Sequence, residues 1–252
     1  MSTALQIKDL VKQFATGKPA VDGVSFDVPA GEIVVLLGPS GCGKSTLLKL
    51  VAGMLQPSRG TVRRPGLLQA ADLTFVFQEP TLMPWAKVQA NVRLPLDLAG
   101  VPRPEADARV TEALHGVGLS GFAMHRPREL SGGMQMRVSI ARALVTRPKL
   151  LLMDEPFGAL DDITRHRLDT ELLTLARAHQ LTVLFVTHSI SEAVYLSDRV
   201  VVMAARPGRV THVQALQQSW PRPEDARTSV DFNAQVRHLQ GHLQAAFDAH
   251  LG

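Results

Sequence analysis

The sequence predicts an α/β protein with a mainly parallel central sheet, an N-terminal antiparallel β region and an inserted α-helical subdomain. Two observations predict this fold class. Short runs of consecutive apolar residues, typical of strands buried on both faces, alternate with segments whose apolar residues recur at helical spacing. In addition, residues 88–147 carry helical spacings that prolines interrupt, which indicates an insertion of helices rather than a further part of the sheet.

The first part of the chain is expected to form mainly strands. Val24, Phe26 and Val28 alternate with polar residues, as in a strand with one buried face. After a turn at residues 29–31, the chain continues as a strand, a glycine-rich loop, a helix and another strand. The expected elements are a buried strand at 32–37, a helix at 46–55 that Gln56-Pro57-Ser58 ends, and a strand at 73–77.

The second part alternates strands with helices. Leu168, Leu172 and Leu175 mark one helix, and Ser189 and Glu192 have the spacing of a capping box at the start of another. Consecutive apolar residues predict strands at 150–153, 182–186 and 199–204.

The expected organisation is one domain, residues 1–210, followed by a C-terminal extension, residues 211–252. The core of the domain comprises residues 1–87 and 148–210, on either side of the helical subdomain at 88–147. Apolar residues at helical spacing predict that the extension is helical: Val236, Leu239, Leu243 and Phe247.

Two histidines in that extension are a weak metal-site candidate. His238 and His242 are four residues apart, so they share one face of the expected helix and could share a metal ion. No third ligand is evident from the sequence. The pair is therefore interpreted as part of a solvated helix face.

Composition excludes several classes of protein. The 252 residues are 45% hydrophobic and 20% charged, as in globular domains and unlike disordered chains. One cysteine cannot form an internal disulfide, which predicts a reducing compartment. The N-terminus has no signal-peptide pattern, and no apolar run approaches the roughly 18 residues of a membrane-spanning helix. The formal charge of +4 comes from scattered Lys and Arg residues, so nucleic-acid binding is not expected.

A glycine-rich loop carries the strongest chemical signal. Residues 38–45 match the pattern G-x-x-x-x-G-K-[ST] between a buried strand and a helix. The glycines let main-chain N–H groups point at phosphate oxygens, and the helix N-terminus adds partial positive charge. Lys44 is expected to reach the β- and γ-phosphates of a nucleotide, and the Ser45 hydroxyl to ligate Mg²⁺. Cys42 fills a variable position of this loop and is interpreted as incidental to the chemistry.

Two adjacent acids follow a later strand. Asp154 ends the apolar run at 150–153, where its carboxylate can hold Mg²⁺ through water. Glu155 is one residue further and points elsewhere, so it is free to polarise a water molecule for attack on the γ-phosphate. Adjacent acids alone are common, but together with the phosphate loop they predict a nucleotide-hydrolysing site.

Two further features extend this prediction. The segment 130–134, Leu-Ser-Gly-Gly-Met, precedes an expected helix at 136–144, and its hydroxyl, its glycine amides and the helix N-terminus make a second anion-binding site. A nucleotide already held by the phosphate loop does not need that second site. His188 follows the strand at 182–187 and could contact a γ-phosphate.

Along the chain, the phosphate loop, the segment 130–134, the two acids and His188 follow one another as in the ATP-binding subunits of ABC transporters. The chain resembles that family from about Leu5 to Arg209. The resemblance implies ATP and Mg²⁺ as ligands, with Phe14 stacking on adenine and residues 158–161 forming the D-loop. It implies metal binding by Ser45, Gln78 and Asp154, and catalysis by Glu155, His188 and Lys44. The implied nucleotide-binding residues are Phe14, Gly38, Pro39, Ser40, Gly41, Cys42, Gly43, Lys44, Ser45, Thr46, Gln78, Ser131, Gly132, Gly133 and Met134.

Within that family, residues 77–85 and 131–134 look like those of the nitrate/sulfonate/taurine-type import ATPases. This resemblance implies a subunit that hydrolyses ATP to energise a membrane importer for a small solute. An importer for a thiamine-precursor pyrimidine and an exporter stay open as alternatives, and a non-transport P-loop ATPase is a more distant one. A DNA-repair or chromosome-organising ATPase would need a long coiled-coil insertion, whereas only about a hundred residues separate Ser45 from Asp154.

The resemblance also implies partners. One phosphate loop and one Ser-Gly-Gly segment per chain imply a head-to-tail homodimer with two shared ATP sites. The helical subdomain and the segment after Gln78 are expected to accept a helix of integral membrane permease subunits, with Met83 and Trp85 lining the groove. A solute-binding protein would act with the permease. The chain would then lie peripherally on the cytoplasmic face of the bacterial inner membrane.

Overall fold

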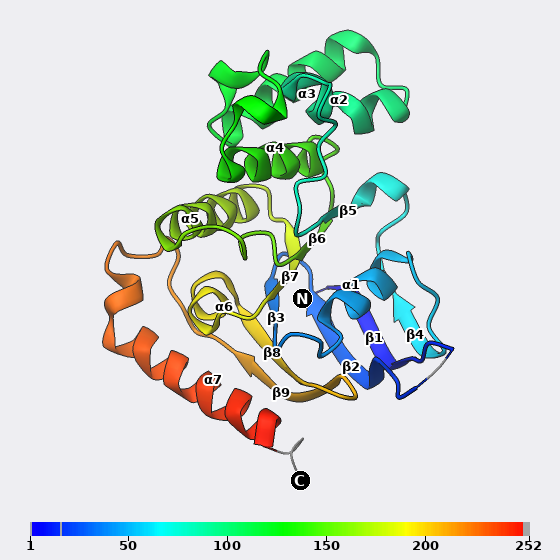
Figure 1. The fold of residues 1–252 in the computed structure, drawn as a ribbon, viewed down its shortest axis with the longest axis vertical. Helices are drawn as coiled ribbons and strands as arrows, with labels where there is room; N and C mark the ends of the chain where they lie inside the picture. Colours follow the sequence, from blue (N-terminus) through cyan, green and yellow to red (C-terminus); the bar gives the residue numbers. More distant parts are fainter. Residues whose placement is uncertain (1, 16, 249–252) are drawn as a thin grey trace.

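The fold is built on two β-sheets, which a computed structural model shows for residues 2–15 and 17–248 (Figure 1). The larger sheet has, in order, β5 (Leu73–Val76), β6 (Leu150–Asp154), β7 (Thr182–Thr187), β3 (Ile33–Leu37), β8 (Arg199–Ala204) and β9 (Arg209–Ala215). Neighbouring strands of this sheet are parallel, except that β9 is antiparallel to β8. The smaller, antiparallel sheet has the order β2 (Val21–Pro29), β1 (Thr3–Lys12) and β4 (Arg59–Arg63).

Helices cover the larger sheet and extend beyond one end of it. Three of them form a separate layer at the top of Figure 1: α2 (Val88–Leu98), α3 (Arg103–Gly116) and α4 (Gly132–Leu144). The others lie beside the sheet: α1 (Lys44–Ala52), α5 (Asp162–Ala178), α6 (Ile190–Leu196) and α7 (Val230–Asp248). The predicted fold class, a mainly parallel sheet with an antiparallel β region and inserted helices, is confirmed.

Strand β3 is apolar throughout because both of its faces are buried. Ile33, Val35 and Leu37 belong to the core that the helical layer, α5 and α6 complete. Val34 and Leu36 belong to a second core with α1 and the smaller sheet. The larger sheet therefore separates two hydrophobic cores, and its central strand is fixed from both sides.

Two helices differ from their expected ranges. Helix α1 ends at Ala52 rather than near Gln56, because Gly53 adopts a left-handed conformation with φ of 77° and donates to the carbonyl of Leu50. Helix α4 begins at Gly132, four residues before the expected start. Ser131 makes this possible, because its Oγ accepts the N–H of Met134 at 3.3 Å and caps the helix.

Strand β9 and helix α7 make the C-terminal extension part of the main body. Strand β9 was not expected, and it crosses position 210, where the domain was expected to end. Helix α7 contacts β8, β9 and α6, and it buries Phe232 and Leu239. The side chain of the expected apolar residue Phe247 lies outside the described side chains. Among the described residues, no helix combines the length and the apolar character that crossing a membrane requires.

The expected capping box at α6 is only half formed. Ser189 Oγ accepts the N–H of Glu192 at 3.3 Å, but the N–H of Ser189 is bound by Thr187 Oγ1 at 2.9 Å instead of by the Glu192 carboxylate. That carboxylate is turned into the interior. The Ser189–Glu192 spacing therefore predicted the cap by Ser189 but not the burial of the Glu192 carboxylate.

Glu192 meets a second buried acid, Asp169 of α5. Arg227, which precedes α7, donates to Asp169 Oδ2 at 2.7 Å and lies 3.5 Å from the ring centroid of Tyr195. Burial and, to a smaller extent, the charge of Asp169 raise the pKa of Glu192 to about 8. Each acid has one buried oxygen without a hydrogen-bond donor among the described residues. If Glu192 keeps its proton, its carboxyl group can donate a hydrogen bond to the Asp169 carboxylate. That bond gives both oxygens a partner.

This pair predicts a pH dependence of stability. The folded chain holds the Glu192 proton up to about pH 8, whereas a free glutamate loses it near its ordinary pKa of 4.5. The free energy of unfolding therefore falls as the pH rises between these values. Glu192→Gln stays neutral, so its free energy of unfolding should not fall in this way. The difference in unfolding free energy between Glu192→Gln and wild type should therefore shift in favour of the variant by about 1–3 kcal/mol from pH 5 to pH 8.

Urea unfolding at the two pH values measures this difference. Glu224→Gln is the matched control, because Glu224 is exposed. A stability difference between Glu192→Gln and wild type that does not change with pH would contradict a protonated Glu192.

Candidate functional site

Three parallel strands end side by side at one edge of the larger sheet. Strand β3 pairs with β7 as far as Leu37–Thr187, and β6 pairs with β7 as far as Asp154–Val186. Because the strands run in the same direction, the segments that follow them begin at the same edge (Figure 1). Those segments carry the phosphate loop, Glu155 and His188.

The phosphate loop, residues 38–43, fits closely against neighbouring main chain. Gly43 has a φ of 93°, in the left-handed region that favours glycine, and a Cβ there would lie 2.5 Å from the carbonyl oxygen of Ala20. A Cβ on Gly38 would lie 2.7 Å from the carbonyl oxygen of Met203. The path of the chain between β3 and α1 therefore requires both glycines.

Lys44, the first residue of α1, is only 4% exposed. Its Nζ donates to the carbonyl oxygens of Gly38 at 2.7 Å and Pro39 at 3.0 Å, and it lies 3.5 Å from Oε1 of Glu155. A phosphate anion accepts more strongly than a carbonyl, so this ammonium is placed to bind phosphate in the loop. Cys42 is buried beside it, and burial raises the pKa of its thiol. The thiol stays protonated and packs the loop.

Ser45 and Asp154 bring two oxygen ligands together. Ser45 Oγ donates to Oδ1 of Asp154 at 2.8 Å, although the residues are 109 positions apart in the chain. Burial raises the pKa of Asp154, and the hydrogen bond from Ser45 opposes this. Hydroxyl and carboxylate oxygens are ligands that Mg²⁺ prefers, and a cation would stabilise the buried carboxylate. This pair of donors therefore fits Mg²⁺.

Glu155 lies between a cation and an imidazole. Its Oε2 is 3.1 Å from Nδ1 of His188, while its Oε1 faces Lys44. The N–H of Glu155 donates to the carbonyl of Val186 at 3.1 Å, and a φ of 45° turns the chain sharply after Asp154. This turn separates the contacts of Glu155 from those of Asp154. A carboxylate held in this way can take a proton from water.

Gln78 lies just beyond the end of the neighbouring strand β5, at the same edge. It is exposed and stands two residues after Val76, the last residue of β5, which pairs with Met153 of β6. Its place is compatible with the expected contact to metal and nucleotide.

Other expected residues of the nucleotide site lie within the loop, in α1 and after β1. Ser40 and Gly41 are exposed within it, and Thr46 is half-buried in α1. Phe14 follows β1, and its side chain is 49% exposed, with Lys12 Nζ 5.3 Å from the ring centroid. An exposed ring of this kind can stack on a base.

Two side chains that the sequence did not single out hold the segment after Gln78. Arg142 of α4 donates to the carbonyl oxygens of Pro80 and Thr81, each at 2.9 Å. Asn91 of α2 is fully buried and accepts the N–H of Met83 at 2.7 Å. Only Asn91 could have been found from the sequence, because it is an asparagine on the otherwise apolar face of an expected helix.

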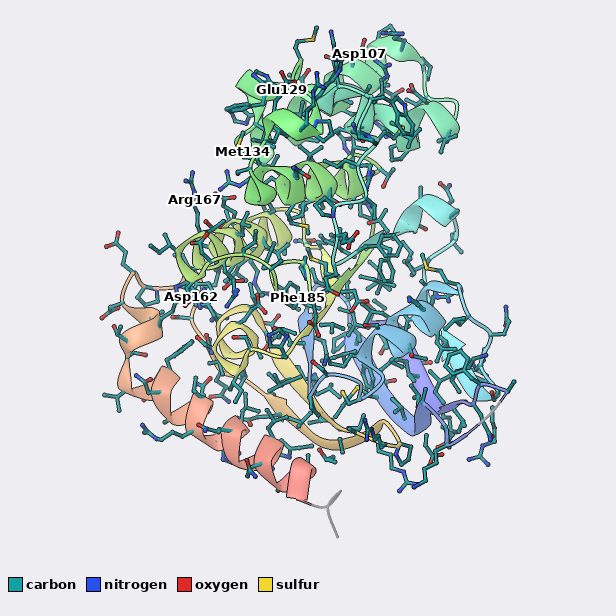
Figure 2. The ribbon with its side chains drawn as sticks, in the orientation of Figure 1. Asp107, Glu129, Met134, Asp162, Arg167 and Phe185 are labelled. Atoms are coloured by element: carbon teal, nitrogen blue, oxygen red, sulfur yellow. The ribbon has the colours of Figure 1, made fainter. Side chains whose placement is uncertain are left out.

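The Ser-Gly-Gly-Met segment lies apart from this edge. In Figure 1, α4 is separated from α1, and Figure 2 shows Met134 at the left end of α4. Ser131 and Gly132 are exposed, and Met134 is half-buried. The first N–H groups of a helix lack intrahelical partners, so this end of α4 can bind an anion. Within the described part of one chain, the structure assembles Lys44, Ser45, Asp154, Glu155 and His188 but leaves this segment at a distance.

Gly133 has a role inside the chain that the sequence did not reveal. It is buried, and a Cβ there would lie 2.9 Å from Cγ2 of Thr164 in α5. At Gly132, a Cβ would meet Leu160 Cδ2 at 3.7 Å, an ordinary contact. A side chain at Gly133 would thus disturb the packing of α4 on α5, so Gly132 is the better position for testing this segment.

Comparisons with known proteins identify the family. The family model described as ABC transporter matches residues 21–158, more than half of the chain. The chain belongs to the ABC transporter family. It is 50% identical to an aliphatic sulfonates import ATP-binding protein of Pseudomonas syringae, over 84% of this chain and 85% of that protein. It is 52% identical to a taurine import ATP-binding protein of Rhizobium johnstonii, over 76% of this chain and 74% of that protein.

A solved structure of the ABC family has a similar fold. It is a dimeric ATP-binding cassette in a post-hydrolysis state, bound to ADP and Pi. The TM-score is 0.74 at 32% identity, over 85% of this chain and 100% of that one. These comparisons confirm the predicted resemblance and the assignment of this chain as an ABC-type ATP hydrolase.

Two variants separate nucleotide binding from turnover at this ABC site. Glu155→Gln keeps the shape of the side chain but cannot take a proton, so ATP hydrolysis should fall about 10²-fold or more while ATP binding persists. Lys44→Ala removes the cation at the phosphate loop and should lose binding itself. A labelled ATP analogue and a phosphate-release assay measure the two properties.

Glu224→Gln is again the matched control, and it should behave as wild type. If Glu155→Gln turned over at the wild-type rate, or if Lys44→Ala kept wild-type affinity, the roles given to these residues would be wrong.

Proposed function

We propose that this chain is the ATP-hydrolysing subunit of a membrane importer for a small solute of the nitrate, sulfonate or taurine class. The observation that carries the proposal is the assembly of Lys44, Ser45, Asp154, Glu155 and His188 at one sheet edge. The import function that the names of the sulfonate and taurine relatives state supports the direction of transport and the solute class.

ATP is the substrate in this proposal. The N–H groups of the phosphate loop and Lys44 bind the β- and γ-phosphates, and Ser45, Asp154 and Gln78 would hold Mg²⁺. When bound, Mg²⁺ would neutralise charge on the phosphates. Glu155 takes the proton of the attacking water, whose oxygen bonds to the γ-phosphorus as the bond to the β-phosphate oxygen breaks. ADP and phosphate are the products, and His188 positions the Glu155 carboxylate through the contact at Oε2.

A second copy of the chain completes each site in the proposed arrangement. Ser131 and Gly132 are exposed at the start of α4, which is separated from α1 and the phosphate loop in Figure 1, so they are available to the γ-phosphate on a partner. A head-to-tail homodimer gives each ATP one phosphate loop and one Ser-Gly-Gly segment. The dimeric form of the similar ATP-binding cassette supports this arrangement.

The segment from Gln78 to Trp85 is the proposed contact with integral membrane permease subunits. The Trp85 side chain is 73% exposed, while Arg142 holds the main chain at Pro80 and Asn91 holds it at Met83. Exposed tryptophan on a rigid segment is typical of protein interfaces. The segment begins beside the nucleotide site, so it can transmit ATP-driven dimer closure to the permease. The chain would then sit peripherally at the cytoplasmic face of the membrane, with a solute-binding protein acting through the permease.

A deletion strain of the encoding organism tests the proposal. We expect it to lose uptake of labelled nitrate, taurine or an alkanesulfonate, and to regain it with the wild-type gene but not with Glu155→Gln. Trp85→Ala should keep the ATPase rate of the purified chain and lose uptake, whereas Leu68→Ala, at an equally apolar position with 88% exposure, should lose neither. Normal uptake of all three solutes by the deletion strain would contradict the proposed function.

A further inference from the structure

Three histidines meet where helix α7 packs against strand β9, and none of them belongs to the nucleotide site described above. His212 lies on β9, and His238 and His242 lie one turn apart on α7. One ring nitrogen from each lies within 4.8 Å of those of the other two. The sequence showed only the pair on α7, because the third histidine comes from the strand that was not expected.

The rings are packed against one another. His212 and His242 stack with centroids 3.6 Å apart and planes at 8°, and His238 stands edge-on to His242 at 4.7 Å. The Nε2 atoms of His238 and His242 are 3.3 Å apart. That separation matches the roughly 3.3 Å between two nitrogens that bind one Zn²⁺ at about 2.0–2.1 Å in tetrahedral geometry.

One nitrogen of this cluster is buried without a partner. Nε2 of His212 is shielded from solvent and has no hydrogen-bond partner among the described residues. Leaving a buried polar atom unpaired is costly, so a ligand at this point would be stabilising. Neutral imidazoles present the lone pairs that a metal ion needs.

The cluster therefore has the composition of a metal site rather than of a solvated helix face. Imidazole ligands favour Zn²⁺ and similar transition-metal ions over Mg²⁺, which prefers oxygen ligands. We propose that His212, His238 and His242 bind one Zn²⁺-type ion that fastens helix α7 to the edge strand β9. Water would occupy the fourth position, and the stacked rings would turn about their Cβ–Cγ bonds to point their nitrogens at the ion.

The site would add a cross-link to packing that exists without it. Phe232 and Leu239 already bury one face of α7, so variants of the histidines should fold. Strand β9 is the last strand of its sheet, and α7 contacts both β8 and β9 there (Figure 1). A metal ion at this point would lower the freedom of the C-terminal helix without touching the ATP site.

Zinc binding to the tag-free, chelator-treated full chain tests the proposal. In the presence of excess Mg²⁺, equilibrium dialysis should find one Zn²⁺ per chain, and Co²⁺ should give the intense visible absorption of a tetrahedral site. His212→Ala keeps the α7 pair but removes the third ligand, and it should weaken Zn²⁺ binding by at least about tenfold. His242→Ala should weaken it further. His115→Ala, at an exposed histidine of α3, is the matched control and should bind as wild type.

Two readouts connect binding to structure. Zn²⁺ should slow hydrogen exchange of the α7 amides in wild type and not in His212→Ala, while affinity for an ATP analogue should be equal in both. Zinc binding that His212→Ala leaves unchanged, or no binding by wild type at tens of micromolar Zn²⁺, would overturn the proposal. Binding with no effect on α7 exchange would overturn the fastening role.

Discussion

The parallel pairing of β3, β7 and β6 is the constraint on which the site depends. Main-chain hydrogen bonds set this register, and the N–H of Glu155 extends it to the carbonyl of Val186 beyond the end of β6. Segments far apart in the chain thereby deliver an ammonium, a hydroxyl, two carboxylates and an imidazole to one edge. The two hydrophobic cores hold β3 from both faces, so the architecture around the sheet serves to keep this edge in place.

Charges at that edge compensate one another. The buried ammonium of Lys44 and the carboxylate of Glu155 lie 3.5 Å apart, and either one alone would be costly to bury. Asp154 has only the Ser45 hydroxyl as a hydrogen-bond partner in the positions described, which leaves it suited to a divalent cation. The edge lacks the groups at the start of α4. Those groups are exposed and separate from it, and in the proposed homodimer the second chain supplies them.

Most of the site could be predicted from local sequence patterns. The features that depend on tertiary contacts could not. The phosphate loop, the two acids and His188 follow apolar strands, and the sheet topology brought them together as expected. Strand β9 was missed because two of its three inward residues, His212 and Gln214, are polar and give no apolar alternation. That omission also hid the third histidine of the metal candidate. The buried role of Gly133 depends on Thr164 of another helix, which no sequence spacing reveals.

The division of each ATP site between two chains is the central claim, and the ATPase rate of mixed dimers tests it most directly. Gly132→Asp places a negative charge at an exposed helix N-terminus, where it suits the helix but repels phosphate, and Gly132→Asn is its neutral match. A dimer of Gly132→Asp with Lys44→Ala has one site with both defects and one with neither. The account predicts inactive homodimers of each, with ATP hydrolysis restored on mixing and Gly132→Asn less impaired than Gly132→Asp. Hydrolysis at the wild-type rate by Gly132→Asp alone, or no recovery on mixing, would contradict it.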